Sequence, residues 1–142
     1  VTSPLPLSSI GVAGAAGFVA LSTDGTSVCA LSSGRTALSC ALLSTLAPRL
    51  PAGRGLRLVA TPSGAIVYSP SPEAPGAALL SLWAGQLSLL KFDSGASAVS
   101  APVKLPNTGG HAVALVAVPP LAGGATTVSV VSLESGEELY ND

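Results

Sequence analysis

The chain has 142 residues, of which 48% are hydrophobic, 9% are charged and 4% are aromatic, and its formal net charge is −1. Intrinsic disorder requires low hydrophobicity and high charge, so this composition predicts a folded chain of about one domain. The six Lys and Arg residues are scattered among seven acids. This argues against a nucleic-acid-binding protein, which needs a basic face.

The first third of the chain predicts a hairpin after an extended start. The nine N-terminal residues are rich in Pro and Ser and are expected to form an extended lead-in. The β-prone run Phe18–Leu21 and the strand Ser27–Ser32 flank an Asp24-Gly25 turn, and Asp-Gly between apolar runs is a strong hairpin signal. Thr36–Leu46 has the Ala and Leu content of a helix, but its Ser, Thr and Cys residues weaken one, and we predict a strand.

The middle of the chain alternates loops with two strands. Ala47–Gly55 contains two prolines and two glycines and is expected to be a loop. Leu56–Thr61 and Ala65–Ser69 are predicted strands on either side of a Pro-Ser-Gly turn. Ser69–Gly76 holds three prolines, which exclude regular structure and predict an exposed, semi-rigid loop.

The rest of the chain is typical of short strands joined by glycine-containing turns. Ala112–Val118 is wholly apolar, which predicts a strand in the middle of a buried sheet. Hairpin turns are expected at Ala84-Gly85, Ser94-Gly95 and Ser135-Gly136, because glycine adopts positive φ without steric cost. The predicted strands are Ala78–Trp83, Gln86–Phe92, Ala98–Val103, Ala112–Val118, Thr126–Leu133 and Glu137–Tyr140.

No segment has the character of a transmembrane helix. The stretch His111–Leu133 contains Pro-Pro and Gly-Gly pairs, which break a helix. The sequence begins at Val1 with neither an initiating Met nor a basic segment, so no signal peptide is visible. We therefore interpret the chain as an excised piece of a longer protein.

Cys29 and Cys40 are the two cysteines and the candidate site residues of the chain. Two small buried thiols are one interpretation, since free Cys is among the most buried residue types. A disulfide is the other, provided that the two residues lie on paired strands and in an oxidising compartment. A Cys/His zinc site is not expected, because the chain has one His.

The sequence lacks motifs that carry chemistry: it has no Gly-x-Ser-x-Gly turn, no P-loop and no Gly-x-Gly-x-x-Gly helix start. His111 is expected to be structural or solvent-facing. Glu134, Glu137 and Glu138 lack the spacing of a calcium loop and predict a solvated hairpin tip. Trp83 is expected to pack in a core or at a sheet edge. We therefore predict a non-catalytic protein without a cofactor, metal or small-molecule ligand.

Two segments of the chain match each other. Leu87–Gly95 and Val128–Gly136 both run aliphatic, Ser, two aliphatics, polar, large apolar, acid, Ser, Gly, at an offset of 41 residues. Four-stranded propeller blades repeat at roughly 40–45 residues. A weaker echo, Val28–Gly34, ends 61 residues before Gly95, which is one such period plus a loop of about 20 residues.

The repeat predicts an all-β fold of antiparallel four-stranded sheets, as a segment of a WD40/quinoprotein-like β-propeller. The two matching segments are then expected at equivalent positions in successive sheets. A β-sandwich or a partly open barrel is the alternative architecture.

Ala78–Asp93 and Val128–Tyr140 resemble the subunit 1 family of the endoplasmic reticulum (ER) membrane protein complex. In that family, a strand ending in Tyr or Trp, a Gly turn and a Leu-Ser-Leu-Leu-Lys strand precede a hairpin with a Glu-x-Gly turn in one propeller. Gly17–Leu31 is similar to an upstream hairpin of the same propeller. The low charge, the Ala/Gly/Ser bias and the Pro-rich loop depart from the family pattern and leave the blade boundaries undefined.

The resemblance implies that residues 1–142 are one all-β unit of two to three propeller blades, on the luminal side of the ER membrane. The complex inserts and matures tail-anchored and multipass membrane proteins. This segment would be a non-catalytic scaffold whose partners are other subunits of the complex, with client membrane proteins or luminal chaperones as further candidates. Exposed sheet faces and edges predict that the isolated chain also self-associates.

Two other functions stay open at this point. One is a WD-like propeller scaffold of another complex in the cytosol or nucleus, where cysteines are kept reduced. The other is a propeller enzyme such as a quinoprotein dehydrogenase, which would need several cofactor-stacking Trp residues, whereas the chain has one Trp.

Overall fold

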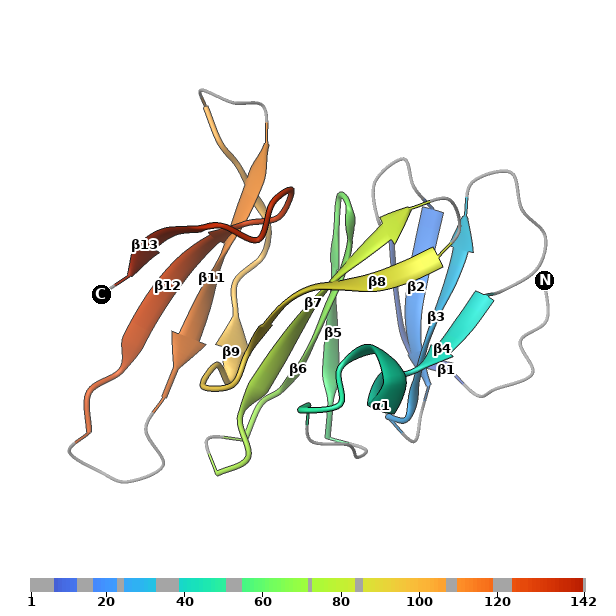
Figure 1. Ribbon diagram of the computed structural model, residues 1–142, viewed down its shortest axis with the longest axis horizontal. Helices are drawn as coiled ribbons and strands as arrows, with labels where there is room; N and C mark the ends of the chain where they lie inside the picture. The colour runs from blue at the N-terminus through green and yellow to red at the C-terminus, as the bar shows by residue number, and fades with distance from the viewer. Residues whose placement is uncertain are drawn as a thin grey trace.

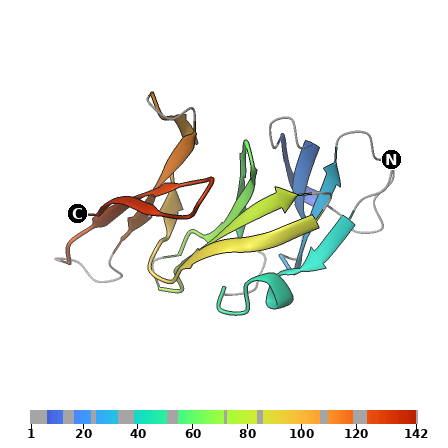
Figure 2. The ribbon, with the colours of Figure 1, turned by 45° about the horizontal axis from the view of Figure 1, so that its top comes forward.

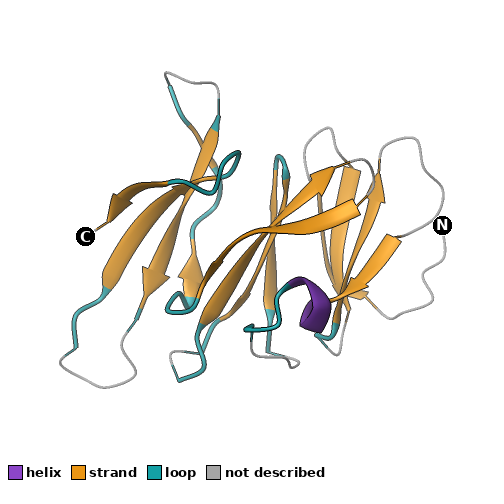
Figure 3. Cartoon of the chain, in the orientation of Figure 1, coloured by secondary structure: helices purple, strands orange, loops and turns teal. Residues whose placement is uncertain are grey.

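Antiparallel strands make up nearly all of the regular structure in the computed structural model (Figures 1 and 3). It describes residues 7–12, 17–22, 25–32, 39–50, 55–71, 73–83, 86–106, 110–118 and 124–141. Within these residues the strands form three sheets, each built from strands that follow one another in the chain. The predicted all-β, antiparallel class is confirmed.

The first sheet consists of four strands in chain order. They are β1 (Leu7–Val12), β2 (Gly17–Ser22), β3 (Ser27–Ser32) and β4 (Ser39–Leu42). The predicted hairpin between β2 and β3 is confirmed, although Asp24 lies outside the described residues. Gly25 has φ 71° and its N–H donates to the Ser22 carbonyl at 3.0 Å, so the left-handed conformation that closes this turn falls on a glycine.

Two expectations for this part of the chain need correction. The N-terminal lead-in is in fact the strand β1 from Leu7 onward, because β2 offers it a neighbour with which to pair. The predicted strand Thr36–Leu46 ends at Leu42 and gives way to one helical turn, α1 (Leu43–Leu46). Residues 36–38 lie outside the described residues.

The second sheet has the same serial order. Its strands are β5 (Arg57–Thr61), β6 (Gly64–Ser69), β7 (Gly76–Trp83) and β8 (Gln86–Asp93). The Ala84-Gly85 turn lies outside the described residues, but Trp83 and Gln86 on either side of it pair across β7 and β8. The described residues between β6 and β7 form no regular structure, as the three prolines predict, and Ser71, Glu73 and Ala74 are exposed.

The third sheet has an interrupted first strand. Its strands are β9 (Ala98–Val99), β10 (Val103–Lys104), β11 (His111–Ala117), β12 (Thr127–Ser132) and β13 (Glu138–Asn141). Both β9 and β10 pair with β11, so together they occupy the outer position that one continuous strand would fill.

Ser100 breaks the strand predicted for Ala98–Val103. Its N–H donates to the Ala114 carbonyl at 3.0 Å, and its hydroxyl accepts the Ala114 N–H at 2.9 Å in place of a backbone carbonyl. A serine hydroxyl that replaces a ladder partner interrupts the regular pairing of the strand. The expected single strand is therefore two short ones.

The three sheets stack in chain order, with the second sheet in the middle (Figures 1 and 2). On β6, Ala65 and Val67 pack toward the first sheet, whereas Ile66 packs toward the third. On β7, Leu80 packs toward the first sheet and Leu79 toward the third. Because successive side chains of a strand point to opposite faces, this nearly continuous apolar sequence buries both faces of the second sheet.

The third sheet is buried on one face. Val113 and Leu115 of β11 and Val131 of β12 join Ile66 and Leu79 in one core cluster. On the opposite face, the side chains of Ala114, Val116, Val128 and Val130 are only half-buried. The apolar strand at 112–118 therefore lies in the middle of its sheet, as predicted, but only one of its two faces is fully buried.

The two matching sequence segments do not occupy equivalent positions. Leu87–Phe92 lies in β8, the last strand of the second sheet, whereas Val128–Ser132 lies in β12, which has β13 as a further neighbour. The two segments lie in different sheets and do not pair with each other. However, the prediction that they occupy equivalent positions in successive sheets is wrong.

Their similar turns perform different tasks. The Asp93 carboxylate accepts the Gly95 N–H at 2.9 Å at the connection from the second sheet to the third. The predicted Ser94-Gly95 turn is thus a link between sheets and not a hairpin. At Ser135-Gly136 the predicted hairpin is confirmed, because Gly136 has φ 73° and its N–H donates to the Ser132 carbonyl at 2.8 Å, between β12 and β13.

Gly64 offers a test of the central sheet. A Cβ atom at this position would collide with the Leu80 carbonyl oxygen and lie 3.0 Å from the Leu82 nitrogen. Overpacking of this kind is not relieved by side-chain movement, so we expect Gly64→Ala to lower the free energy of unfolding by about 1–3 kcal/mol. Gly55→Ala is the matched control, since nothing lies within 4 Å of its Cβ position. Urea denaturation curves in which the two variants are equally stable would contradict this packing.

Candidate functional site

Cys29 and Cys40 lie directly opposite each other on β3 and β4 and form a disulfide. The register follows from the pairing of Val28 with Ala41 and of Ala30 with Ser39 on either side. The two Cα atoms are 4.0 Å apart. Of the two interpretations of the cysteines, the structure shows the bonded pair.

The two ends of the disulfide differ in their access to solvent. Cys29 is completely buried, on a strand with neighbours on both sides. Cys40 is exposed, and β4 pairs with β3 alone among the described strands. The bond therefore connects the buried centre of the first sheet to its outer edge.

The segment that follows Cys40 closes one end of the space between the first and second sheets (Figure 2). Leu43, Ala47 and Leu50 are buried in one cluster with residues of both sheets. Those residues are Leu21, Val28, Val67, Ala78 and Leu80.

Backbone hydrogen bonds fix this segment locally. The Leu43 N–H donates to the Thr26 carbonyl at 2.9 Å, the Ala47 N–H to the Leu43 carbonyl at 2.7 Å, and the Leu50 N–H to the Ala47 carbonyl at 3.0 Å. The helix α1 has no side-chain cap and neither an acidic first turn nor a basic last turn. A single turn of this kind is not stable by itself, so burial of its apolar side holds it in place.

Arg49 adds one contact between this segment and the second sheet. Its guanidinium lies over the Phe92 ring of β8, 5.1 Å from the centroid. A cation at this distance from an aromatic face is attracted by the ring quadrupole, by about 0.5–1 kcal/mol at an exposed site.

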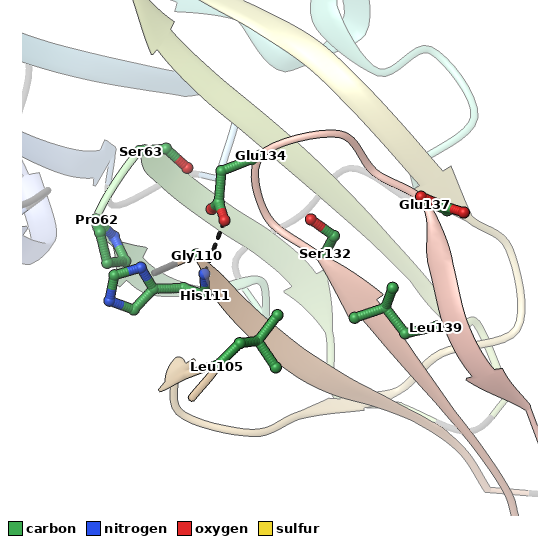
Figure 4. Close-up of a pocket in the computed structure, with 9 residues that line it drawn as sticks. All are labelled: Pro62, Ser63, Leu105, Gly110, His111, Ser132, Glu134, Glu137 and Leu139. Carbon is green, nitrogen blue, oxygen red and sulfur yellow. Dashed lines mark hydrogen bonds between the residues drawn. The ribbon is translucent and has the colours of Figure 1, made fainter. Parts of the chain in front are cut away.

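A second feature is an open hollow of about 560 Å³ between turns of the second and third sheets (Figure 4). The residues around it come from the β5–β6 turn, the segment between β10 and β11 with the start of β11, and the β12–β13 hairpin. They are Pro62, Ser63, Leu105, Gly110, His111, Ser132, Glu134, Glu137 and Leu139.

Two polar side chains of the hollow form hydrogen bonds with backbone groups of the loops around it. The His111 backbone N–H donates to the Glu134 carboxylate at 2.7 Å, and the Ser63 hydroxyl donates to the Leu133 carbonyl at 3.4 Å. Glu137 lies on the other limb of the hairpin from Glu134 in Figure 4. The carboxylate of Glu134 thus contacts the backbone of His111 and not its imidazole, which gives no acid–base pair at this place.

The other predicted residues lie apart from both features or at the rim of the hollow. Glu134, Glu137 and Glu138 are exposed on the β12–β13 hairpin, as predicted, and Glu138 forms a 3.9 Å ion pair with Lys91 of β8. The side chain of Trp83 falls outside what the structure describes. Within the described ranges, no three His, Cys, Asp or Glu side chains are grouped so that they could hold a metal ion.

Sequence reasoning found the cysteine pair but missed the segment that it anchors. The one available signal was the apolar spacing of Leu43, Ala47 and Leu50, three or four residues apart, which is the spacing of one helical face. Two prolines and two glycines nearby obscured this signal by predicting a loop.

Comparison with known proteins adds no family assignment. No protein-family model matches the chain, and no curated protein matches its sequence. In the described part of the chain, no helix is long and apolar enough to cross a membrane.

The disulfide should contribute measurably to stability. Its two cysteines are 11 residues apart, and closing a loop of this size stabilises a protein by about 3 kcal/mol through the entropy of the unfolded chain. We expect the double variant Cys29→Ala/Cys40→Ala to lose about this much free energy of unfolding in urea titrations. Ser44→Ala, at an exposed position of α1, is the control and should change stability by less than about 0.5 kcal/mol. Equal midpoints for the double variant and the oxidised wild type would refute the stabilising role.

Proposed function

We propose that this chain is a segment of a β-propeller and acts as a non-catalytic luminal scaffold of the ER membrane protein complex. The observation that carries the proposal is the serial stack of three antiparallel sheets, two with four strands and one whose first strand is split. Propeller blades are four-stranded sheets of this kind, and each blade packs its faces against its neighbours. The resemblance of Ala78–Asp93 and Val128–Tyr140 to the subunit 1 family supplies the functional assignment.

The central sheet supports the propeller over the sandwich. A sandwich has two sheets, each with one inner and one outer face. Here the second sheet is buried on both faces, by Leu80 toward the first sheet and by Leu79 toward the third. Repeated stacking of this kind is what a propeller requires.

The disulfide supports a luminal location. Disulfides persist in oxidising compartments, which include the ER lumen, and are rare in the cytosol and nucleus. The pairing of Cys29 with Cys40 in register therefore favours the luminal scaffold over a WD-like scaffold of a cytosolic or nuclear complex.

As a scaffold, this segment would contribute surface to the other subunits of the complex. Client membrane proteins and luminal chaperones are further candidate partners. The open hollow at the turns and the half-buried face of the third sheet are two surfaces that the described residues leave accessible. The activity of the complex, insertion and maturation of tail-anchored and multipass membrane proteins, would reside in other subunits.

Affinity purification of the full-length protein tests the proposal. We expect membrane-embedded subunits of the complex to co-purify in detergent, and Cys29 and Cys40 to resist alkylation until a reductant is added. Recovery with a cytosolic or nuclear complex, with both thiols alkylated directly, would favour the WD-like scaffold and overturn the luminal assignment. A tagged luminal protein of unrelated fold serves as the control for non-specific recovery.

The isolated chain should self-associate through the outer face of the third sheet. Val103, 62% exposed, pairs with Ala112 on that face, and the described residues Ala114, Val116, Val128 and Val130 of the same face are apolar and uncharged. With 9% charged residues, the chain has little electrostatic repulsion to oppose association. We expect concentration-dependent sedimentation, which Val103→Lys should weaken by roughly tenfold because it places a charge in the interface.

The matched control for this experiment is Leu89→Lys. Leu89 is 39% exposed on β8, at the edge of the second sheet, and should leave association unchanged. A strictly monomeric chain at high concentration would instead favour a self-contained sandwich or barrel over excised blades.

A further inference from the structure

We propose that the Cys29–Cys40 disulfide is a thiol–disulfide exchange site that takes a dithiol oxidoreductase as its partner. The thiolate of the partner attacks the Cys40 sulfur, and reduction of the disulfide allows the segment Ser39–Leu50 to detach from the two sheets that it covers. The inference depends on the geometry around the disulfide and holds whether or not the chain belongs to the ER membrane protein complex.

The difference in exposure selects the sulfur that is attacked. A thiol–disulfide exchange needs a thiolate to reach one sulfur of the bond directly. Cys29 is completely buried, whereas Cys40 is an exposed residue on an edge strand. The incoming thiolate therefore bonds to the Cys40 sulfur, and the electron pair of the broken S–S bond leaves on Cys29, which takes up a proton.

The same asymmetry selects the chemical class of the partner. After the first step, the buried Cys29 thiol lies next to the mixed disulfide at Cys40 and can reverse the reaction. A monothiol has no fast way to prevent this reversal. In a dithiol, the second thiolate attacks the mixed disulfide, so that the partner leaves as its own disulfide and the chain retains two thiols. Two electrons and two protons pass from the partner to the chain.

The disulfide is the strongest restraint on β4. This strand has four residues and pairs with β3 alone among the described strands, and three of its four residues are exposed. The helical turn that follows has no side-chain cap. A strand with few buried side chains and one paired edge opens locally at a small cost, so that without the bond only the burial of Leu43, Ala47 and Leu50 and the local backbone hydrogen bonds hold the segment. Removing the covalent tie therefore increases the population in which Ser39–Leu50 is detached.

Detachment exposes an apolar surface. Leu43, Ala47 and Leu50 leave the cluster that they share with both sheets. The residues of the two sheets in this cluster, which would lose its packing, are Leu21, Val28, Val67, Ala78 and Leu80. The redox state of one surface-accessible bond thus controls access to the core between the first and second sheets.

A trapping experiment tests the attacked sulfur. The probe is a thioredoxin whose resolving cysteine is replaced by serine, incubated with the folded, oxidised chain and followed by non-reducing peptide mapping. We expect a mixed disulfide at Cys40. An adduct at Cys29, or an adduct that forms only after the chain is unfolded in urea, would overturn the exchange site.

Amide hydrogen exchange tests whether the disulfide holds the segment Ser39–Leu50 against the two sheets. Reduction should speed exchange at Leu43, Ala47 and Leu50 by up to about 150-fold, the factor that corresponds to the stabilisation expected of a loop-closing bond of this size. Ile66 and Leu79, in the central strands β6 and β7, exchange through global unfolding and should stay much slower than the segment in the reduced chain, which shows that the opening is local.

The double variant Cys29→Ala/Cys40→Ala provides the matched comparison, since it lacks the bond without any reductant. It should reproduce the exchange pattern of the reduced wild type. If the double variant and the reduced wild type instead exchange like the oxidised wild type at Leu43 and Ala47, the disulfide does not hold this segment in place. If Ile66 and Leu79 instead exchange as fast as Leu43 and Ala47 in the reduced chain, the opening is global unfolding and the local opening is rejected.

Discussion

Burial of the second sheet on both of its faces is the constraint on which the rest of the structure depends. Ile66, Val67, Leu79 and Leu80 are almost fully buried, and they point alternately toward the two neighbouring sheets. Each such side chain contributes about 1.5–3 kcal/mol when it is removed from water. Within the described residues, the core clusters join each of the other two sheets to the second sheet.

The connections between the sheets differ in how they are held. The link from the second sheet to the third is short and relies on local hydrogen bonds, such as that between the Asp93 carboxylate and the Gly95 N–H. The link from the first sheet to the second is longer, and its described part packs Leu43, Ala47 and Leu50 into the core. The disulfide at Cys40 anchors the start of this link between the first and second sheets. The chemistry of the candidate site and the packing of the core therefore meet in one segment.

Glycine positions show how closely the sheets and their turns approach. Gly136, with φ 73°, brings the β12–β13 turn against Leu90 of β8, where a Cβ would lie 3.3 Å from the Leu90 side chain. Leu90 is the extra residue at an irregularity in the pairing of β7 with β8. The Lys91–Glu138 ion pair lies beside this contact and is half-exposed, so solvent screening leaves it a small part of the stability. Packing of the turn, more than charge, joins the outer edges of the second and third sheets.

The sequence by itself determined the all-β class and most of the strands, because alternation and glycine-containing turns are local properties. It also identified the cysteine pair as the candidate site, but it left open whether the two thiols were bonded. Only the tertiary structure decided that β1 is a strand, that Ser100 divides a predicted strand, and that Leu43–Leu46 forms a helical turn. Each of these depends on contact with another segment: β2 for β1, Ala114 for Ser100, and the core of two sheets for Leu43. The repeat of Leu87–Gly95 in Val128–Gly136 was misleading, because an alternating aliphatic and serine pattern describes any half-buried strand and does not specify its place within a sheet.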